Sequence, residues 1–398
     1  MSVTETAVAE TAVSGTPRLA VPPLREAAPA AMRAAAVHAA RADADRRLPA
    51  EPVRALVDAG FARHFVPRRW GGTEGGFAEL LEAVAVVGEG CAATAWLASL
   101  GAQVGRMASF LPAEGCAEVW AEGPDALLVG GLVPAGTATA RDGGWVLDGT
   151  WPFVSGVEFS AWALLCGRVR GPEGGGAGGD GRDGGELRFF AVRRDAYRIR
   201  ETWDSLGMRA TGSHTLLVED AFVPAARSFP YADLLRGAGP EDGPGAPCYR
   251  VPHKAVNGLA FAAPALGATR ALVRGWSDWG APQPEVVRAG AEADAAQLLL
   301  ERTAAEADRG AGGALSTARA TRDCAVAAEL LGVAAGRVFR AYGTRGQSSA
   351  HPAQRVWRDV TTATTHAALR FPAAVTAYGA AAAGESTAAA GESIGAAE

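Results

Sequence analysis

The stretch GTWPFVSG, residues 149–156, combines large aromatic rings with a hydroxyl group and an unobstructed backbone. Side chains alternate between the two faces of a strand, so Trp151, Phe153 and Ser155 are expected on one face. Gly156 follows the serine directly. A flat ligand with an apolar centre and a polar edge would fit this surface. A tight turn at the end of a core strand would also explain it, so the stretch alone leaves both interpretations open.

His366 is a second candidate for chemistry, at the end of the segment DVTTATTH. An imidazole titrates near neutrality, so it can donate a hydrogen bond and act as an acid or a base. A single histidine in an Ala/Thr-rich segment is more often a solvated or structural residue. Its role therefore depends on which other segments the fold brings to it.

The composition excludes several classes of protein. The 398 residues suffice for two or three domains, and the net charge of −5 with scattered basic residues gives no indication of a nucleic-acid partner. No run approaches the roughly 18 apolar residues of a membrane helix. The N-terminus lacks the features of a signal peptide, which predicts a cytoplasmic protein. The five cysteines show no CxxC spacing, so we expect free, mostly buried thiols and no metal site.

The hydrophobic pattern changes twice along the chain. Residues 23–125 are predicted to be helical: in PAEPVRALVDAGF, for example, Val53, Leu56 and Val57 share a face and Gly60 ends the helix. Short β-rich runs separated by Gly, Asp and Pro occupy residues 126–235. Helical patterns return over 248–385, where Ala327, Leu331 and others form one apolar stripe.

The expected architecture is therefore an α+β multidomain protein with a middle β domain between two helical domains. Within the middle domain, the glycine-saturated and acidic segment 171–186 is predicted to be a flexible surface loop. The tails 1–22 and 386–398 contain too little bulk to pack, and we expect both to be disordered.

This order of domains resembles the acyl-CoA dehydrogenase fold over residues 25–385. The segment LGMRATGS…VEDAFVP (206–224) is similar to the middle-domain signature of that family. Two more segments, 148–156 and 351–366, resemble the oxygenase components of two-component flavin-dependent monooxygenases, which include hydroxyphenylacetate, dibenzothiophene, indole and polyketide hydroxylases. The resemblance implies an N-terminal helical domain, a middle β-barrel-like domain and a C-terminal four-helix bundle.

The resemblance also assigns expected cofactor contacts. The cofactor would be reduced FAD or FMN, and the missing family arginine after residues 267–280 leaves the choice between them open. Phe153 takes the place of a stacking tryptophan, Ser155 that of a threonine bonded to flavin N5, and Gly156 offers its amide. Gly131 and Leu132 match the strand that passes the pyrimidine side of the flavin.

Further residues carry alternative interpretations. Trp203 would close the ring pocket or pack in the core, and Ser348, with Ser349, would bond phosphate or cap a helix. Gln103 stands where several relatives have a second histidine, and we expect it to contact substrate. Arg106 would face the same substrate cavity or lie in solvent. His64 is expected to be structural.

The last helices distinguish an oxygenase from a dehydrogenase. In the dehydrogenases a glutamate base follows an Arg-Asp pair by eight residues; here the pair is Arg358-Asp359 and the position is Ala367. Glu292 and Glu301 remain conceivable bases from another helix, as in some relatives. In the oxygenases a histidine from this segment, here His366, approaches the edge of the flavin where oxygen adds as a C4a-hydroperoxide. The histidine found three residues earlier in some relatives is replaced by Ala363.

The resemblance predicts a monooxygenase that uses O₂ and reduced flavin to hydroxylate an aromatic or polycyclic substrate of phenolic, indole or polyketide type. Its partners would be a separate NAD(P)H:flavin reductase and further copies of the chain, in a homotetramer or homodimer. Two alternatives stay open at this stage: an FAD-dependent acyl-CoA dehydrogenase, and an inactive subunit that only binds or supports a partner.

Overall fold

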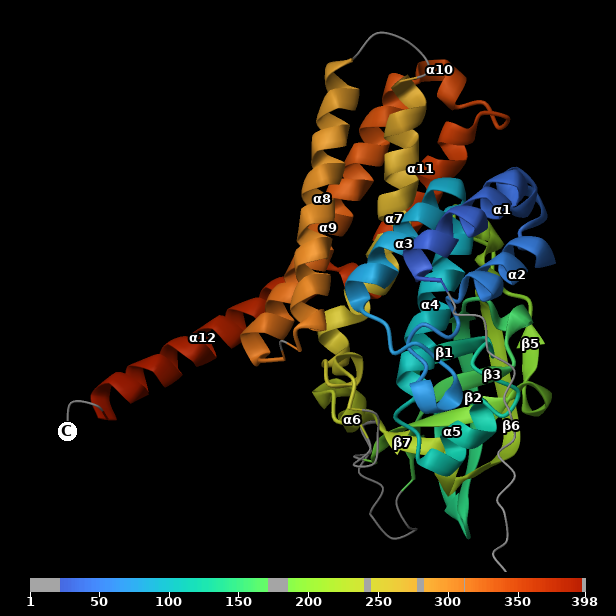
Figure 1. The fold of residues 1–398 in the computed structure, drawn as a ribbon, viewed down its shortest axis with the longest axis vertical. Helices are drawn as coiled ribbons and strands as arrows, with labels where there is room; N and C mark the ends of the chain where they lie inside the picture. The colour runs from blue at the N-terminus through green and yellow to red at the C-terminus, as the bar shows by residue number, and fades with distance from the viewer. Residues whose placement is uncertain (1–21, 171–184, 240–244, 278–282, 311, 396–398) are drawn as a thin grey trace, which may run out of the picture.

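The computed structural model describes residues 22–170, 185–239, 245–277, 283–310 and 312–395 (Figure 1). For residues 277 and 385–395 it describes the backbone alone. The expected N-terminal tail and flexible loop therefore lie almost entirely outside the described residues.

The N-terminal region is helical, as predicted. It contains α1 (Leu24–Asp45), α2 (Ala50–Ala59), α3 (Phe77–Gly90), α4 (Ala92–Ala108) and α5 (Ala113–Val119). Helix α2 ends at Gly60, whose φ of 94° is the left-handed conformation that favours glycine at a helix end. Helix α4 is buried along nearly its whole length, which places it between the sheet and the C-terminal helices.

The middle region forms one seven-stranded sheet in the order β5-β6-β2-β1-β3-β4-β7. The strands are β1 (Leu128–Arg141), β2 (Gly144–Val154), β3 (Trp162–Val169), β4 (Leu187–Arg193), β5 (Arg198–Arg200), β6 (His214–Pro224) and β7 (Ser228–Pro230). All neighbours are antiparallel except β1 and β3. The barrel-like expectation is not confirmed, because in the described residues β5 and β7 are unpaired edges. Each has only three residues, too few to close a sheet around a lumen.

The C-terminal region returns to helices: α6 (Tyr231–Arg236), α7 (His253–Ser277), α8 (Pro284–Asp308), α9 (Ala314–Ala341), α10 (Gly343–Gly346), α11 (Pro352–Thr364) and α12 (Phe371–Gly395). Helices α7, α8, α9 and α11 pack side by side (Figure 1). The predicted stripe of α9 is buried at Ala327, Leu331, Ala334 and Val338.

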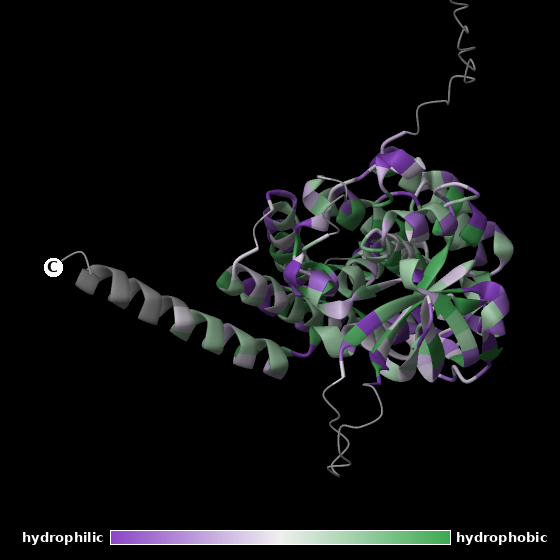
Figure 2. Ribbon diagram, turned by 90° about the horizontal axis from the view of Figure 1, so that it is seen from below, coloured by the Kyte–Doolittle hydropathy of each residue, from purple (hydrophilic) through white to green (hydrophobic). Residues whose placement is uncertain are grey.

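Helix α12 extends away from the body of the protein in both views (Figures 1 and 2). It continues to Gly395, past residue 386, from which the sequence predicts a disordered tail. Alanine has the highest helix propensity of all residues, and this segment is alanine-rich.

Helix α7 corrects a second expectation. Residues 253–276 are long and apolar enough to cross a membrane, although no such run was expected. However, 78% of the window concerned is buried inside the protein, which is typical of a core helix. All five cysteines are free and buried, as predicted.

Candidate active site

Phe153 lies in a β-bulge that turns its ring out of the sheet. The register between β2 and β6 shifts between Trp151 and Val154, and the φ of Phe153 is 62°, in the left-handed region. Trp151 is 1% exposed whereas Phe153 is 72% exposed, so the expected alternation on one face is wrong. A strained backbone and an exposed aromatic ring at one position are typical of a ligand site.

Ser155 and Gly156 form the turn that ends β2, so the turn interpretation is confirmed. Gly156 has a φ of 71°, and its N–H donates to the Thr211 carbonyl at 2.8 Å. The expectation that this amide is offered to a cofactor is therefore wrong, because the turn itself uses the N–H. The Ser155 hydroxyl accepts from Trp96 Nε1–H at 3.1 Å and lies 2.8 Å from the Ser213 hydroxyl. The half-buried serine is thus oriented by α4 and by the loop before β6.

A second bulge lies beside it in β1. The β1–β3 register shifts between Gly131 and Gly136, and neither ladder of β1 pairs residues 132–135. A Cβ on Gly131 would lie 2.8 Å from the Trp151 ring, so this position has room only for glycine. The backbone groups of residues 132–135 are therefore released from the sheet. Backbone hydrogen bonds to a ligand are the contacts that the family resemblance predicts for Gly131 and Leu132.

His366 reaches the same region from the opposite side. Its ring stacks on Phe261 of α7, with centroids 3.6 Å apart, and meets Trp96 edge-on at 5.8 Å. Trp96 therefore contacts His366 with its ring and Ser155 with its indole N–H. The two predicted catalytic residues are brought together around one tryptophan that the sequence argument did not identify.

The hydrogen bonding of His366 fixes its tautomer. Its Nδ1 accepts from the Ala368 N–H at 3.2 Å, at the start of the short 3-10 helix η7 (Ala367–Leu369). Burial lowers the pKa of His366 from 6.5 to about 4, so the ring is neutral at pH 7. A neutral ring whose Nδ1 is an acceptor carries its proton on Nε2. His366 thus keeps one N–H that can donate, while its acceptor nitrogen is already engaged.

The loop 203–208 closes one side of the site. Trp203 lies edge-on to Phe153, with ring centroids 6.2 Å apart, and donates its Nε1–H to the Met208 carbonyl at 3.0 Å. Leu206 in the same loop is 59% exposed. Trp203 therefore lies beside the ring of Phe153, is anchored to its own loop, and also packs against the hydrophobic core.

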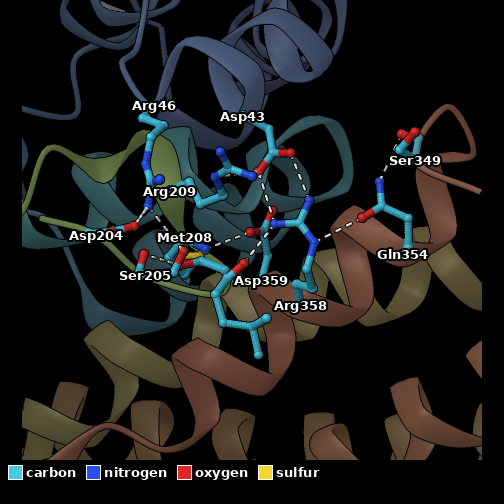
Figure 3. A network of polar contacts seen from close by, with 12 residues as sticks. Asp43, Arg46, Asp204, Ser205, Met208, Arg209, Ser349, Gln354, Arg358 and Asp359 are labelled. Carbon is cyan, nitrogen blue, oxygen red and sulfur yellow. Dashed lines mark hydrogen bonds and ion pairs between the residues drawn. The ribbon is translucent and has the colours of Figure 1, made fainter. Parts of the chain in front are cut away.

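A polar network anchors this loop to α1 and α11 (Figure 3). The Met208 N–H donates to Asp359 Oδ1 at 2.6 Å, and Arg358 binds both carboxylate oxygens of Asp43 at 3.2 and 2.7 Å. Arg358 also donates to the Leu206 carbonyl at 2.7 Å. Burial raises the pKa of Asp359 to about 6. The Arg-Asp pair of the sequence thus positions the loop from the helix that leads to His366.

Buried polar atoms without partners gather between α4 and the start of α7. Gln103 Oε1, Arg106 Nη1 and both ring nitrogens of His253 have no hydrogen-bond partner among the described residues. Gln103 Nε2 donates to the Val256 carbonyl at 3.4 Å, and Arg106 Nε to the Cys248 carbonyl at 2.6 Å. Burial and the Arg106 charge lower the pKa of His253 to about 3, so its ring is neutral. Such groups call for a polar ligand or water.

Two alternatives of the sequence argument are corrected here. Arg106 is 0% exposed, so it does not lie in solvent. Ser348 and Ser349 do not cap α11, because His351 takes that position and accepts from the Ala353 N–H. Ser348 precedes the start of this 13-residue helix, which is about 20 Å long, whereas His366 follows its end.

His64 and the two candidate dehydrogenase bases have other partners. His64 is buried and bonded through Nε2 to the Gly76 carbonyl at 2.9 Å, as expected of a structural residue. Glu292 forms an ion pair with Arg337 at 3.0 Å. Glu301 is exposed on α8, where it accepts from Gln297. In the described residues no group of three or more His, Cys, Asp or Glu could hold a metal ion.

Comparison with known proteins identifies the fold. The model of the acyl-CoA dehydrogenase N-terminal domain matches residues 24–112, and that of the acyl-CoA dehydrogenase C-terminal domain matches residues 259–371. The structure of a Rhodococcus 3-HSA hydroxylase has a TM-score of 0.84 and 25% identity, covering 91% of this chain and 97% of that one. The chain has the acyl-CoA dehydrogenase fold.

Similar proteins of known activity identify the class of enzyme within this fold. The chain is 32% identical to the oxygenase component of an FADH₂-dependent resorcinol hydroxylase from Rhizobium, over 84% of this chain and 87% of that protein. It is 31% identical to the HsaA oxygenase subunit of Mycobacterium tuberculosis, over 81% and 86%. Streptomyces XiaF, solved with FADH₂ and glycerol, has a TM-score of 0.82 at 27% identity, covering 91% and 95%. The chain belongs to the oxygenase components of the flavin-dependent monooxygenases.

The residues of the site fit a flavin. The bulged Phe153 with Trp203 offers an aromatic surface, and the unpaired backbone of residues 132–135 offers hydrogen bonds to a heterocycle edge. Ser155 and His366 supply the two side-chain polar groups. The sequence argument missed Trp96, Phe261 and His253. Trp96 and Phe261 occur within apolar helical segments whose pattern indicates only burial.

Proposed function

We propose that this oxygenase component hydroxylates a phenolic aromatic compound in the cytoplasm, using reduced FAD or FMN from a separate NAD(P)H-dependent reductase. One observation carries the proposal: Trp96 joins the Ser155 hydroxyl and the neutral His366 ring beside the exposed ring of Phe153. The resorcinol hydroxylase relative, with which the chain shares most of its length, supports a phenolic substrate.

The residues divide into those that hold the cofactor and those that face the reacting oxygen. Reduced flavin, when bound, supplies the electrons with which O₂ is activated. Phe153 and Trp203 would cover the ring system, and the backbone of Gly131 and Leu132 would bond its polar edges. Ser155 would bond N5. The burial of Trp96 and Phe261 excludes water from the space around them, which protects a reactive oxygen species.

His366 would act as a donor through Nε2–H. Its Nδ1 is occupied by a backbone N–H and its pKa is about 4, so it is neither a cation nor a free base at neutral pH. A donor can hold the oxygen to be transferred but cannot first remove a proton from the substrate. This favours substrates whose ring is already electron-rich, such as phenols.

Gln103, Arg106 and His253 would bind the polar end of the substrate. Their unpartnered atoms include an amide oxygen, a guanidinium N–H and a neutral imidazole, which together can accept and donate. Gln103 lies seven residues from Trp96 on α4, about 10 Å along the helix. A substrate that reaches from Trp96 to Gln103 would carry an oxygen substituent about 10 Å from the carbon that is hydroxylated.

The C-terminal helices would form a four-helix bundle that joins the chains in a homotetramer or homodimer. Val287 and Leu298 on α8 and Val333 on α9 are exposed apolar residues, and α12 extends from the same region (Figure 1). Exposed apolar side chains on packed helices are typical of association surfaces. Sedimentation equilibrium on the purified chain would measure the number of copies.

The function is tested by turnover under ¹⁸O₂. The purified chain is combined with a flavin reductase, NADH, FAD or FMN, and a panel of mono- and dihydroxylated aromatic compounds, with indole and an acyl thioester as comparisons. We expect one ¹⁸O atom in a hydroxylated phenol. Reduction of the flavin by the acyl thioester, with no labelled product from any aromatic compound, would contradict the proposal.

A further inference from the structure

Three hydroxyl groups form a continuous chain that starts at Ser155. The Ser155 Oγ lies 2.8 Å from Ser213 Oγ, and Ser213 Oγ lies 2.7 Å from Thr211 Oγ1. Thr211 Oγ1 lies 2.9 Å from the Met208 carbonyl oxygen, which is the last acceptor in this series of hydrogen bonds. We call these three side chains the hydroxyl relay. Ser213 and Thr211 are buried, and Ser155 is the half-buried end at the site.

The groups at the two ends give the relay a direction. A carbonyl oxygen only accepts, so the 2.9 Å contact requires Thr211 to donate to Met208. Each hydroxyl has one proton, so Ser213 then donates to Thr211, and Ser155 donates to Ser213. The Trp96 indole N–H donates to Ser155 and takes one of its two lone pairs. Ser155 is left with one lone pair and no proton for a ligand.

We propose that the hydroxyl relay makes Ser155 a hydrogen-bond acceptor and thereby selects the reduced form of the flavin, which carries a proton on N5. Oxidised flavin has only a lone pair at N5, so it would need Ser155 as a donor. This inference rests on the proposed function, because it takes Ser155 as the residue that faces N5. It explains how an oxygenase component can favour the form of the cofactor that its reductase delivers.

Reversing the relay to bind oxidised flavin has a definite cost. If Ser155 donated to the ligand, Ser213 and then Thr211 would also turn. Two oxygen atoms, Thr211 Oγ1 and the Met208 carbonyl, would then face each other without a hydrogen between them, although the Trp203 indole N–H and the Thr211 N–H would still donate to that carbonyl. One hydrogen bond would be lost inside a buried network, where the bonds strengthen one another. The loss corresponds to about a tenfold preference for reduced flavin.

The carbonyl at the end of the relay is held rigidly. Met208 has a φ of 54°, and its N–H donates to the Asp359 carboxylate at 2.6 Å (Figure 3). A Cβ on Gly207 would lie 2.0 Å from the Arg358 carbonyl, so the loop touches the backbone of α11. Asp359 and Gly207 are therefore positioning residues for the relay. Through them α11 orients Ser155, while the same helix leads to His366.

The experiment compares the dissociation constants of reduced and oxidised FAD, measured anaerobically by fluorescence titration of each variant. Thr211→Val removes the end of the relay at nearly constant volume and frees Ser213 to donate to Ser155. Thr211→Ser keeps the hydroxyl and is the conservative rescue. Thr215→Val is the matched control: its buried hydroxyl lies 2.8 Å from Thr202 Oγ1, outside the relay.

We expect Thr211→Val to lower the preference for reduced FAD about tenfold, mainly by tighter binding of oxidised FAD. Thr211→Ser and Thr215→Val should keep the wild-type ratio. Ser213→Ala breaks the relay at its middle, should have the same effect, and replaces Thr211→Val if that variant does not fold. An unchanged ratio in Thr211→Val or Ser213→Ala would overturn the inference, as would an equal loss in Thr215→Val.

The two proposals fail in different ways. If wild-type protein yields ¹⁸O-labelled product but the relay variants keep its ratio, only the relay is wrong. If wild-type protein binds oxidised FAD as tightly as reduced FAD, the relay has no selectivity to explain and is wrong. Absence of labelled product with the selectivity intact would contradict the proposed hydroxylation and leave the role of the relay supported.

Discussion

The two ends of α11 carry histidines with the same local role and different surroundings. His351 accepts from the Ala353 N–H at 3.1 Å, and His366 accepts from the Ala368 N–H at 3.2 Å. Each Nδ1 therefore caps the backbone two residues further on. His351 lies against Tyr342 at 4.8 Å, in the turn before the helix. His366 lies between Phe261 and Trp96, next to the Ser155 cluster.

The comparison shows that capping through Nδ1 does not distinguish His351 from His366. What differs is the surroundings of the ring, and therefore the groups available to Nε2–H. Capping fixes the same tautomer at both ends, with the proton on Nε2. At the His366 end the ring contacts Phe261 and Trp96, and the indole N–H of Trp96 donates to Ser155 of the hydroxyl relay. Local sequence cannot separate the two cases, because the contacts of His366 come from residues more than 100 positions away.

Replacing the two histidines should give the largest contrast. We expect His366→Ala to lower the rate of product formation about 100-fold, because the only donor proposed for the reacting oxygen is lost. The oxygen consumed should appear as hydrogen peroxide instead. His351→Ala should keep the rate within about twofold and lower the unfolding free energy by about 1 kcal/mol, the usual cost of a lost cap.

His366→Asn separates capping from donation. Its side-chain oxygen can still cap the backbone while its amide N–H₂ donates, so this variant should recover part of the rate. His366→Asp keeps the cap but offers no donor at neutral pH, and it should remain as slow as His366→Ala. Equal rates in His366→Asp and His366→Asn would mean that capping, and not donation, is the role of this residue.

A smaller effect should appear in the dependence of stability on pH. The pKa of His366 is lowered to about 4 by burial, so between pH 6.5 and 4 the unfolded chain binds a proton that the folded chain does not. Folding stability should therefore fall as the pH decreases through this window. His253, with a pKa of about 3, acts in the same direction, and Asp359, raised to about 6, acts in the opposite one.

The contribution of His366 is isolated by comparing variants. Urea unfolding at pH 7 and pH 5 should show a smaller loss of stability in His366→Asn than in wild-type protein. His351→Asn is the control. Identical pH dependence in His366→Asn and wild-type protein would show that His366 is not shielded as the structure implies.

The smallest effect is expected from the glutamates that a dehydrogenase would need. Glu292 is bound to Arg337, and Glu301 is exposed on α8. Glu292→Gln and Glu301→Gln should leave the rate of hydroxylation within about twofold of wild type, because neither residue contacts the Ser155 cluster. A loss of more than tenfold in either variant, measured with the same phenol, would bring the dehydrogenase interpretation back.

The fold was largely predictable, because long periodic helices and short strands separated by Gly and Pro have strong local signals. The bulge at Phe153 was not, since alternation along a strand assumes an unbroken register. The helix α12 extends to Gly395, and low side-chain bulk does not indicate this, because alanine needs no packing to favour a helix.

The site was predictable only in part. Ser155, Phe153 and His366 were proposed through the family resemblance, and the hydroxyl groups of Thr211 and Ser213 stand in the signature that carried it. Trp96 and Phe261 were missed, because a buried aromatic residue in a helix has no local feature that separates packing from a site. Their role arises from contacts between distant segments, which periodicity does not encode.

The central claim is that this chain is built to hold reduced flavin, and anaerobic titration of the wild-type protein with reduced and with oxidised FAD tests it most directly. The account predicts that reduced FAD binds at least tenfold more tightly, because Ser155 can only accept at the site. Tight binding of oxidised FAD without preference, together with its reduction by an acyl thioester, would contradict the account and identify a dehydrogenase.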